Sequence, residues 1–264
     1  MFKIFFIILI IIFIVLISFF AFQKKSSLIS PKIENKVEEV KNTVQDIKDT
    51  IAPKPTKILS TGLPNKHLIK TVFIKQSPEG NWDEPWQDAC EEAAMLTVDY
   101  FYKNVSSITT EQNRDAILKM IDFETTQKFS SDMNASQMAV VAQKYLGYQT
   151  KIIDNPTLED FKKYLSQDIP IIIPADGKIL YQENKHFNNG GPYYHNLTVL
   201  GYDDTKNQFI VHDVGTKAGA YFKYSYQLLM ESIHDFPISG NKEYIATGPK
   251  RVLVLIKLAT VFGV

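Results

Sequence analysis

The sequence predicts an α+β domain, and three observations lead to that fold class. Helical patterns come first, starting near Asp88 and then covering 110–127 and 136–146. The periodicity then changes to short segments rich in Ile, Val, Tyr and Phe between turn residues, which is typical of strands. Helices followed by antiparallel strands are characteristic of an α+β domain. The roughly 200 residues after the N-terminal segments are enough to bury one core.

The first element in chain order is an apolar segment. Ile4 to Phe22 are nineteen consecutive uncharged positions, almost all Ile, Leu, Phe or Val. A helix of this length is about 28 Å long, enough to cross the hydrocarbon of a bilayer. The alternative is a cleaved secretory signal, but that needs a shorter apolar stretch ending in small residues. We therefore expect a transmembrane anchor over residues 1–25 that makes the chain a single-pass protein of the cell membrane, with its bulk extracytoplasmic.

A polar segment, 26–66, connects the anchor to the domain. Apolar residues spaced alternately by four and three place a narrow stripe along 33–51, as in a heptad repeat. The segment is expected to be a stalk helix that leans on the domain or self-associates, because fewer than three heptads make only a marginal coiled coil. Pro53 and Pro55 end this helix and begin a spacer.

The domain, 67–264, has recognisable boundaries between its elements. Asn134 is a good capping residue before the helix over 136–146, and Gly147 is a good stop after it. A further helix is expected over 158–165, between two strands. The turn 203–207 indicates a hairpin. The strands are expected at 67–75, 148–153, 169–174, 195–202, 208–214, 220–223 and 251–257.

Composition excludes several classes of function. The 29 basic and 29 acidic side chains balance, and no run of like charges is dense enough to follow a phosphate backbone, so nucleic acid is not an expected partner. The histidines lack the close spacing of metal ligands, and no phosphate-binding glycine loop is present. We therefore expect neither a metal nor a cofactor.

Cys90 is the only cysteine of the chain, so it cannot form an intramolecular disulfide. It follows an irregular aromatic loop and lies at the expected start of a helix, where unpaired N–H groups and the helix dipole lower a thiol pKa. The negative charges of Glu91 and Glu92 would raise the pKa of the thiol unless His195 carries a compensating proton. The structural alternative is a small buried side chain, but a downstream histidine and carboxylate favour a nucleophile.

His195 begins an expected strand after the flexible loop 188–192, which suits a residue that faces substrate. Asp213 lies on the partner strand of the hairpin and is placed to orient the imidazole, although it is equally suited to cap the turn before Gly215. His186 is a reserve candidate within the loop. His212 is disfavoured because neighbouring strand residues face opposite sides.

Two glutamines precede the cysteine, and either carboxamide can help to bind the negative charge that develops on a carbonyl oxygen. Gln76 ends a strand, whereas Gln87 lies three residues before Cys90 at the start of the helix. We prefer Gln76 as the oxyanion donor and keep Gln87 as the alternative.

These residues together resemble the bacteriocin-processing-like cysteine peptidases, also described as double-glycine leader peptidase-like. The similarity covers about His67 to Thr216. It is carried by Gln76-Ser77-Pro78, Gly80-Asn81-Trp82, Cys90-Glu91-Glu92-Ala93-Ala94, His195-Asn196-Leu197-Thr198-Val199-Leu200-Gly201-Tyr202-Asp203 and Val211-His212-Asp213-Val214-Gly215.

The resemblance implies a papain-like fold and a site in which Cys90 is the nucleophile, His195 the base, Asp213 the orienting group and Gln76 the oxyanion donor. One difference is that Cys90-Glu91-Glu92 replaces the commoner Cys-Gly-Pro. The function expected is that of a membrane-anchored cysteine peptidase acting on a peptide or protein substrate. The alternatives are an amidase or acyl transferase acting on cell-envelope material, and a non-catalytic peptide-binding or scaffold domain.

Overall fold

One antiparallel sheet organises the part of the chain that the structure describes. The structure is a computed structural model in which residues 62–257 are described, so the expected anchor over 1–25 and the stripe over 33–51 lie outside it. Seven strands in this part pair in the order β2-β7-β3-β4-β5-β6, with β1 also paired to β4. The strands are β1 (Lys66–Leu68), β2 (Gln149–Asp154), β3 (Ile171–Asp176), β4 (Tyr194–Asp203), β5 (Gln208–His212), β6 (Phe222–Ser225) and β7 (Arg251–Ile256).

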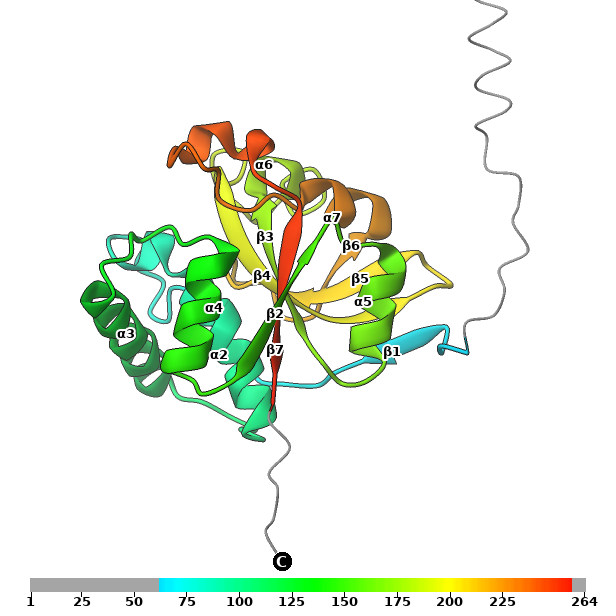
Figure 1. Ribbon diagram of the computed structural model, residues 1–264, viewed down its shortest axis with the longest axis horizontal. Coiled ribbons are helices and arrows are strands. Elements are labelled where there is room, and N and C mark those ends of the chain that lie inside the picture. The colour runs from blue at the N-terminus through cyan, green and yellow to red at the C-terminus, as the bar shows by residue number, and fades with distance from the viewer. Residues whose placement is uncertain (1–61, 258–264) are drawn as a thin grey trace, which may run out of the picture. The chain divides into compact units, whose positions relative to one another are not determined.

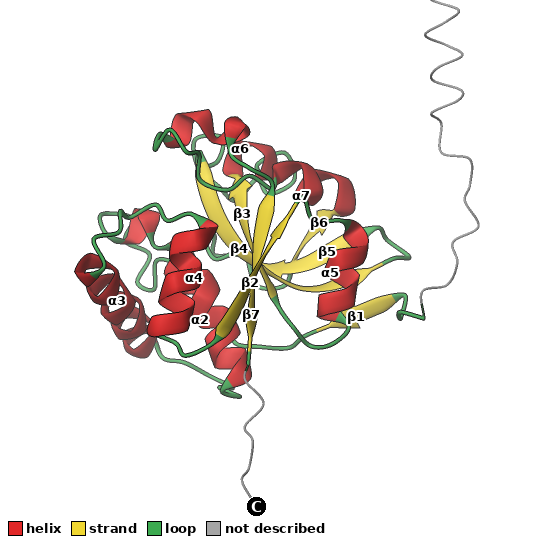
Figure 2. Ribbon diagram, in the orientation of Figure 1, coloured by secondary structure: helices red, strands yellow, loops and turns green. Residues whose placement is uncertain are grey.

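Helices cover both faces of this sheet. The first half of the domain supplies α2 (Cys90–Tyr102), α3 (Thr110–Thr126) and α4 (Ala135–Lys144), which gather on one side of the sheet (Figure 1). Figure 2 shows α5 (Leu158–Leu165) on the other side of the strands. Shorter helices complete the described part. They are η1 (Trp86–Asp88), α6 (Gly177–Leu180), α7 (Tyr226–Ser232) and η2 (Lys242–Thr247).

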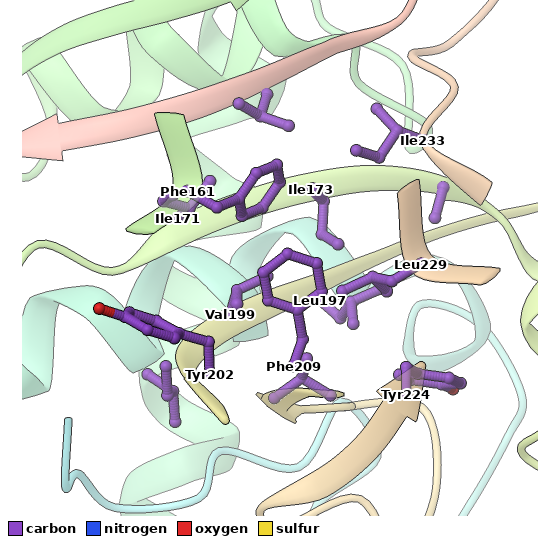
Figure 3. Close-up of a cluster of buried hydrophobic side chains, with 14 of the residues drawn as sticks. Phe161, Ile171, Ile173, Leu197, Val199, Tyr202, Phe209, Tyr224, Leu229 and Ile233 are labelled. Atoms are coloured by element: carbon purple, nitrogen blue, oxygen red, sulfur yellow. The ribbon is translucent and has the colours of Figure 1, made fainter. Parts of the chain in front are cut away.

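The central strands are buried on both faces, and their side chains alternate between two cores. On β3, Ile171 and Ile173 pack into the core that also contains Phe161 of α5, whereas Ile172 packs into the core beneath α2 and α4. Figure 3 shows the first of these cores, in which the ring of Phe161 lies beside that of Phe209, with their centroids 4.9 Å apart. The alternation places two independent apolar layers around one sheet.

Local sequence explains where three of the helices begin. α3, α4 and α5 each start at a capping box, in which a side chain and the backbone three residues later exchange hydrogen bonds. The pairs are Thr109 with Gln112, Asn134 with Gln137 and Thr157 with Asp160. Gly147 ends the α4 region with a φ of 83°, a left-handed conformation that favours glycine. The expected cap of the helix over 136–146 is confirmed, whereas its last helical residue is Lys144 and Gly147 follows after the C-cap Tyr145.

The expected order of helices followed by antiparallel strands is confirmed, but some boundaries were wrong. The first strand covers only Lys66–Leu68 of the expected 67–75, because after a single further bond from Ile69 N–H to the Leu200 carbonyl the chain leaves β4. β5 ends at His212 and not at Val214. In the part of the chain described, no helix has the length and apolarity needed to cross a membrane.

Candidate active site

Cys90 is the first residue of α2, and only Ala89 separates it from η1. This end of α2 packs against β4, where the Thr198 hydroxyl donates a hydrogen bond of 3.0 Å to the carbonyl of Ala94. Only 4% of Cys90 is exposed. The expected position of the cysteine at a helix start is therefore confirmed, and the packing of α2 on the sheet brings its thiol to the start of β4.

Two side chains contact the sulfur. The Cys90 Sγ donates to Glu91 Oε2 at 2.9 Å, and Asn196 Nδ2 lies 3.8 Å from the same sulfur. Asn196 is the neighbour of His195 on β4, so the strand that carries the candidate base also touches the candidate nucleophile. Among the described residues, the thiol and the His195 ring do not share a hydrogen bond in this arrangement.

The surroundings of Cys90 favour its neutral form. Burial raises the pKa of the thiol well above its ordinary value, and the hydrogen bond to Glu91 and the charges of Glu91, Glu92 and Asp132 raise it further. Of the two opposing effects expected from the sequence, that of Glu91 and Glu92 is the one found here, and burial adds to it in raising the pKa. A reactive thiolate at Cys90 requires a compensating proton nearby.

Buried carboxyl groups lie close to Cys90. Glu91 accepts a hydrogen bond of 2.9 Å from the Met133 N–H, and burial together with the charge of Glu92 raises the pKa of Glu91 well above its usual range. Burial raises the pKa of Glu92 to about 7, and that of Glu124, which faces the charge of Glu92, to about 11. The two groups interact with one another, and with its pKa raised to about 11 Glu124 holds a proton at neutral pH.

The structure brings His195 and Asp213 together as a buried, hydrogen-bonded pair. His195 Nε2 lies 2.9 Å from Asp213 Oδ1, and the two side chains are 2% and 0% exposed. The His195 ring also packs edge-on against Phe187, with centroids 5.2 Å apart. Gly215 touches the ring on another side, where a Cβ would lie 2.7 Å from His195 Cε1. The bond to Asp213 fixes the ring and leaves Nδ1 as its other nitrogen.

Two further side chains complete the site around Asp213. Its Oδ2 accepts hydrogen bonds from Asn184 Nδ2 at 2.8 Å and from the Tyr224 hydroxyl at 2.5 Å. Burial alone would raise the pKa of Asp213, but the charge of His195 and these hydrogen bonds hold it below its ordinary value. Asp213 is therefore a carboxylate with both oxygens satisfied. The sequence analysis did not identify Asn184 or Tyr224. The one available signal was the position of Tyr224 on the strand that follows Asp213, where a tyrosine can donate to a buried carboxylate.

Gln76 supports the loop before the nucleophile. Its Nε2 donates two hydrogen bonds of 2.9 Å, one to the carbonyl of Trp86 and one to that of Gln87, while its Oε1 is buried without a partner. Both amide protons therefore hold η1 in this arrangement, and one of them must be released to bind an oxyanion. The Gln87 side chain is exposed and donates to Glu84.

The rings of His212 and His186 make no hydrogen bond to Cys90 or Asp213 among the described residues. The His212 ring is buried between Phe73 and Tyr221, and burial lowers its pKa to about 4. The His186 ring is exposed and lies edge-on to Phe222. Within residues 62–257, no three His, Cys, Asp or Glu side chains are grouped so as to hold a metal ion.

Comparison with known proteins agrees with this geometry. Residues 69–239 match the Peptidase_C39 like family, which is more than half of the chain. The chain belongs to this family. As a C39-like protein it is a cysteine peptidase, and the resemblance drawn from its residues is confirmed. The matched range contains Gln76, Cys90, His195 and Asp213.

Two solved structures are similar to this C39-like peptidase. One is a putative C39-like peptidase from Bacillus anthracis, with 14% identity, coverage of 74% of this chain and 99% of the other, and a TM-score of 0.46. The second is xylellain, a cysteine protease from Xylella fastidiosa, with 12% identity, coverage of 78% and 91%, and a TM-score of 0.42. No curated protein matches the chain.

Proposed function

We propose that the protein hydrolyses peptide bonds through a Cys90-His195-Asp213 triad. The observation that carries this proposal is the buried bond of 2.9 Å between His195 and Asp213, which lies beside Asn196, the β4 residue that contacts the Cys90 sulfur. A histidine held by a buried carboxylate is the arrangement that stabilises an imidazolium and fixes its tautomer. Family membership supplies the class of reaction, and this pair supplies its base.

In the proposed reaction the thiol passes its proton to His195 Nδ1, and the sulfur keeps the electron pair that attacks the peptide carbonyl. The imidazolium, stabilised by Asp213, then protonates the departing amine as the C–N bond breaks. Water hydrolyses the thioester and returns the free thiol. The Cys90 N–H and the Gln76 amide are the donors proposed for the oxyanion.

This sequence of steps requires the Cys90 side chain to turn from Glu91 towards His195. Hydrogen bonds between nucleophile and base are often long or poorly aligned in empty sites and tighten when substrate binds. Asn196, 3.8 Å from the sulfur, links the thiol to the β4 segment that carries the ring. His195 and Asn196 are neighbours on β4 and face opposite sides of the strand, so the Cys90 side chain has to turn away from both Glu91 and Asn196 to reach the ring, and this is the movement that the proposal asks of substrate binding.

A thiol-directed peptide probe tests the proposal on the full-length chain. We expect labelling to disappear in Cys90→Ala and to fall at least about tenfold in His195→Ala, because proton transfer by a positioned histidine contributes at least that much. His186→Ala is the matched control, since this ring is exposed and does not touch Asp213. Equal labelling of the wild type and His195→Ala refutes the triad and favours a non-catalytic binding domain.

The chemical class of the substrate needs a separate experiment, because the same thiol chemistry serves amidases and acyl transferases. Incubation with a peptide library and with isolated cell-envelope material, each analysed by mass spectrometry, separates these activities. We expect Cys90-dependent cleavage of peptides. Cleavage restricted to envelope amides replaces the peptidase proposal with the amidase one.

We also propose that the domain is anchored in the cell membrane by residues 4–22 and faces the extracytoplasmic side. The support is the nineteen-residue uncharged stretch in the sequence. Self-association through 33–51 is a second proposal, supported by the heptad spacing of that segment. Membrane fractionation and protease accessibility in intact cells test the anchor and its orientation, and chemical cross-linking of a 33–51 deletion tests self-association.

A further inference from the structure

A pocket of about 200 Å³ lies between the two chain segments that carry Gln76 and Asp213. One wall is formed by the segment after Gln76, and it includes Trp82. The other wall is formed by the segment after Asp213, including Thr216 and Lys217. A hydrogen bond of 3.1 Å from the Gln76 N–H to the Val214 carbonyl joins the walls. We call this space the Lys75–Lys217 pocket, after the two lysines that line it.

The pocket adjoins the candidate catalytic pair. Val214 lines it, and the next residue, Gly215, packs against the His195 ring closely enough that a Cβ there would lie 2.7 Å from Cε1. Gln76 separates the pocket from η1, which leads to Cys90. A peptide whose carbonyl reaches the thiol therefore has its neighbouring residues beside this pocket.

The charge of the pocket is positive. Lys75 and Lys217 line it and are exposed, and neither ammonium forms an ion pair with another residue of 62–257. The one carboxylate in the lining, Glu79, is paired with Arg114 at 3.1 Å. The negative charge of Glu79 is thus compensated by Arg114, and the two lysine ammonium groups are available to bind a negatively charged group.

Two other lining residues indicate a ligand and not merely a solvated surface. Thr216 is only 5% exposed, and its Oγ1 is buried without a hydrogen-bond partner. Buried hydroxyl groups are normally hydrogen-bonded, so an unpartnered one in a pocket wall has capacity for a bound acceptor. Trp82 is 41% exposed and supplies an aromatic surface for the aliphatic part of a side chain.

We propose that the Lys75–Lys217 pocket is a subsite for a carboxylate of the peptide substrate. The inference rests on the proposed peptidase function and adds its substrate class: peptides with an acidic group close to the cleaved bond. The carboxylate would lie between the two ammonium groups, and rotation of the buried Thr216 hydroxyl towards the pocket would let it donate a further hydrogen bond. An aspartate or glutamate side chain and a free C-terminal carboxylate share this chemistry.

The test uses the full-length chain and a peptide library in which each position carries Glu, Gln or Lys. We expect the value of kcat/KM for Glu at one position near the cleaved bond to exceed that for Gln by at least about fivefold, the effect of a partly exposed ion pair. The preference should appear mainly in KM and weaken at high salt. Peptides ending in a free acid or an amide at the same distance distinguish a C-terminal carboxylate from an acidic side chain.

Charge-reversal variants assign the preference to the pocket. Lys217→Glu should abolish or invert the ratio of kcat/KM for the Glu peptides to that for the Gln peptides. Lys223→Glu is the matched control, because this exposed lysine lies on β6 and does not line the pocket. Cleavage with equal kcat/KM for Glu and Gln at every position overturns the subsite and leaves the peptidase proposal intact.

Binding provides a second readout that does not require turnover. The Cys90→Ala chain is mixed with the Glu and Gln peptide pools, and the bound fraction is separated by equilibrium dialysis and measured by mass spectrometry. Enrichment of the Glu pool that is lost in Cys90→Ala/Lys217→Glu supports the subsite. Equal retention of both pools overturns it, whatever the activity assays show.

Discussion

Replacing Glu91 with glutamine should make the Cys90 thiol more acidic and more reactive. Glu91 Oε2 lies 2.9 Å from the sulfur, and both side chains are buried. The carboxyl group is intrinsically the stronger acid, so the first negative charge of the pair falls on Glu91. Ionisation of the thiol must then occur against that charge. Glutamine removes the charge and offers an N–H that can donate to the thiolate.

The contact distance sets the size of the effect. Two unit charges about 3 Å apart at an effective dielectric constant of about 20 repel by roughly 6 kcal/mol. One quarter of this repulsion, about 1.4 kcal/mol, changes the thiolate fraction tenfold. We therefore expect Glu91→Gln to raise the rate of alkylation at neutral pH by at least about tenfold relative to the plateau at high pH.

The assay is the pH dependence of alkylation by iodoacetamide, followed by mass spectrometry of the Cys90 peptide. Each profile is scaled to its own plateau, so that differences in access to the buried sulfur cancel. Glu92→Gln is the control, because Glu92 is an equally buried carboxyl whose charge also raises the thiol pKa, but less than that of Glu91, which contacts the sulfur, so its replacement should produce a smaller change. Superimposable profiles for the wild type and Glu91→Gln, or an equal change in Glu92→Gln, refute the reasoning.

Three other outcomes are expected. Tyr224→Phe removes a hydrogen-bond donor from the buried Asp213 carboxylate. Because a hydrogen bond to a charged group contributes about 1.5–3 kcal/mol, we expect the free energy of unfolding in urea to fall by that amount. An unchanged denaturation midpoint contradicts this. Gln76→Ala removes the amide that binds the Trp86 and Gln87 carbonyls, and it should lower kcat/KM at least about tenfold. Replacement of the exposed Gln87 by alanine should have little effect. A larger loss of kcat/KM in Gln87→Ala than in Gln76→Ala identifies Gln87 as the oxyanion donor. Glu92 has its pKa raised from 4.5 to about 7, so its extra proton stabilises the folded state fully below pH 4.5 and this contribution is lost as pH rises through 7. The free energy of unfolding should therefore fall by about 3 kcal/mol over that interval, and Glu92→Gln should flatten the fall in denaturation curves measured across it; parallel pH profiles would contradict this assignment.

Much of the fold follows from local patterns that are complete within one segment. Asn134, with Gln137 three residues later, specifies the start of α4 by itself, because a capping box needs no distant partner. The hairpin between β4 and β5 forms at 203–207 as its turn residues indicate. These features were predictable because the groups that satisfy one another lie within a few positions in the chain.

Other boundaries depend on distant residues. The segment 69–75 has strand-forming residues, but the pairing with β4 ends at Leu68 opposite Gly201, and only Ile69 makes one further hydrogen bond to that strand. A segment forms a strand only where its backbone can hydrogen-bond to an adjacent strand, and the composition of the segment does not show whether such a strand is present. α7 is seven residues long, too short for a helical period to stand out from its sequence.

The candidate site shows the same division. Cys90, His195 and Asp213 were nominated by residue type and position, and the pairing of the last two follows from the β4–β5 hairpin. Asn184, however, reaches Asp213 from a loop 29 positions earlier. The resting partner of the thiol is the adjacent Glu91 and not the expected histidine, a contact that depends on side-chain rotamers within the folded core and cannot be read from the sequence.

Glu91 also connects parts of the site that are remote in sequence. One oxygen holds the sulfur and the other accepts from the N–H of Met133, while the carbonyl of Met133 accepts from the Tyr194 hydroxyl at 2.7 Å. Tyr194 precedes His195 on β4, and Asn196, which follows His195, returns to the sulfur. A glycine at position 91 would leave the buried Met133 N–H without its acceptor, a loss of about 1–3 kcal/mol. The acidic residue after the nucleophile therefore closes a ring of contacts between α2, the segment before α4 and β4, and its charge at the thiol is a consequence of that structural role.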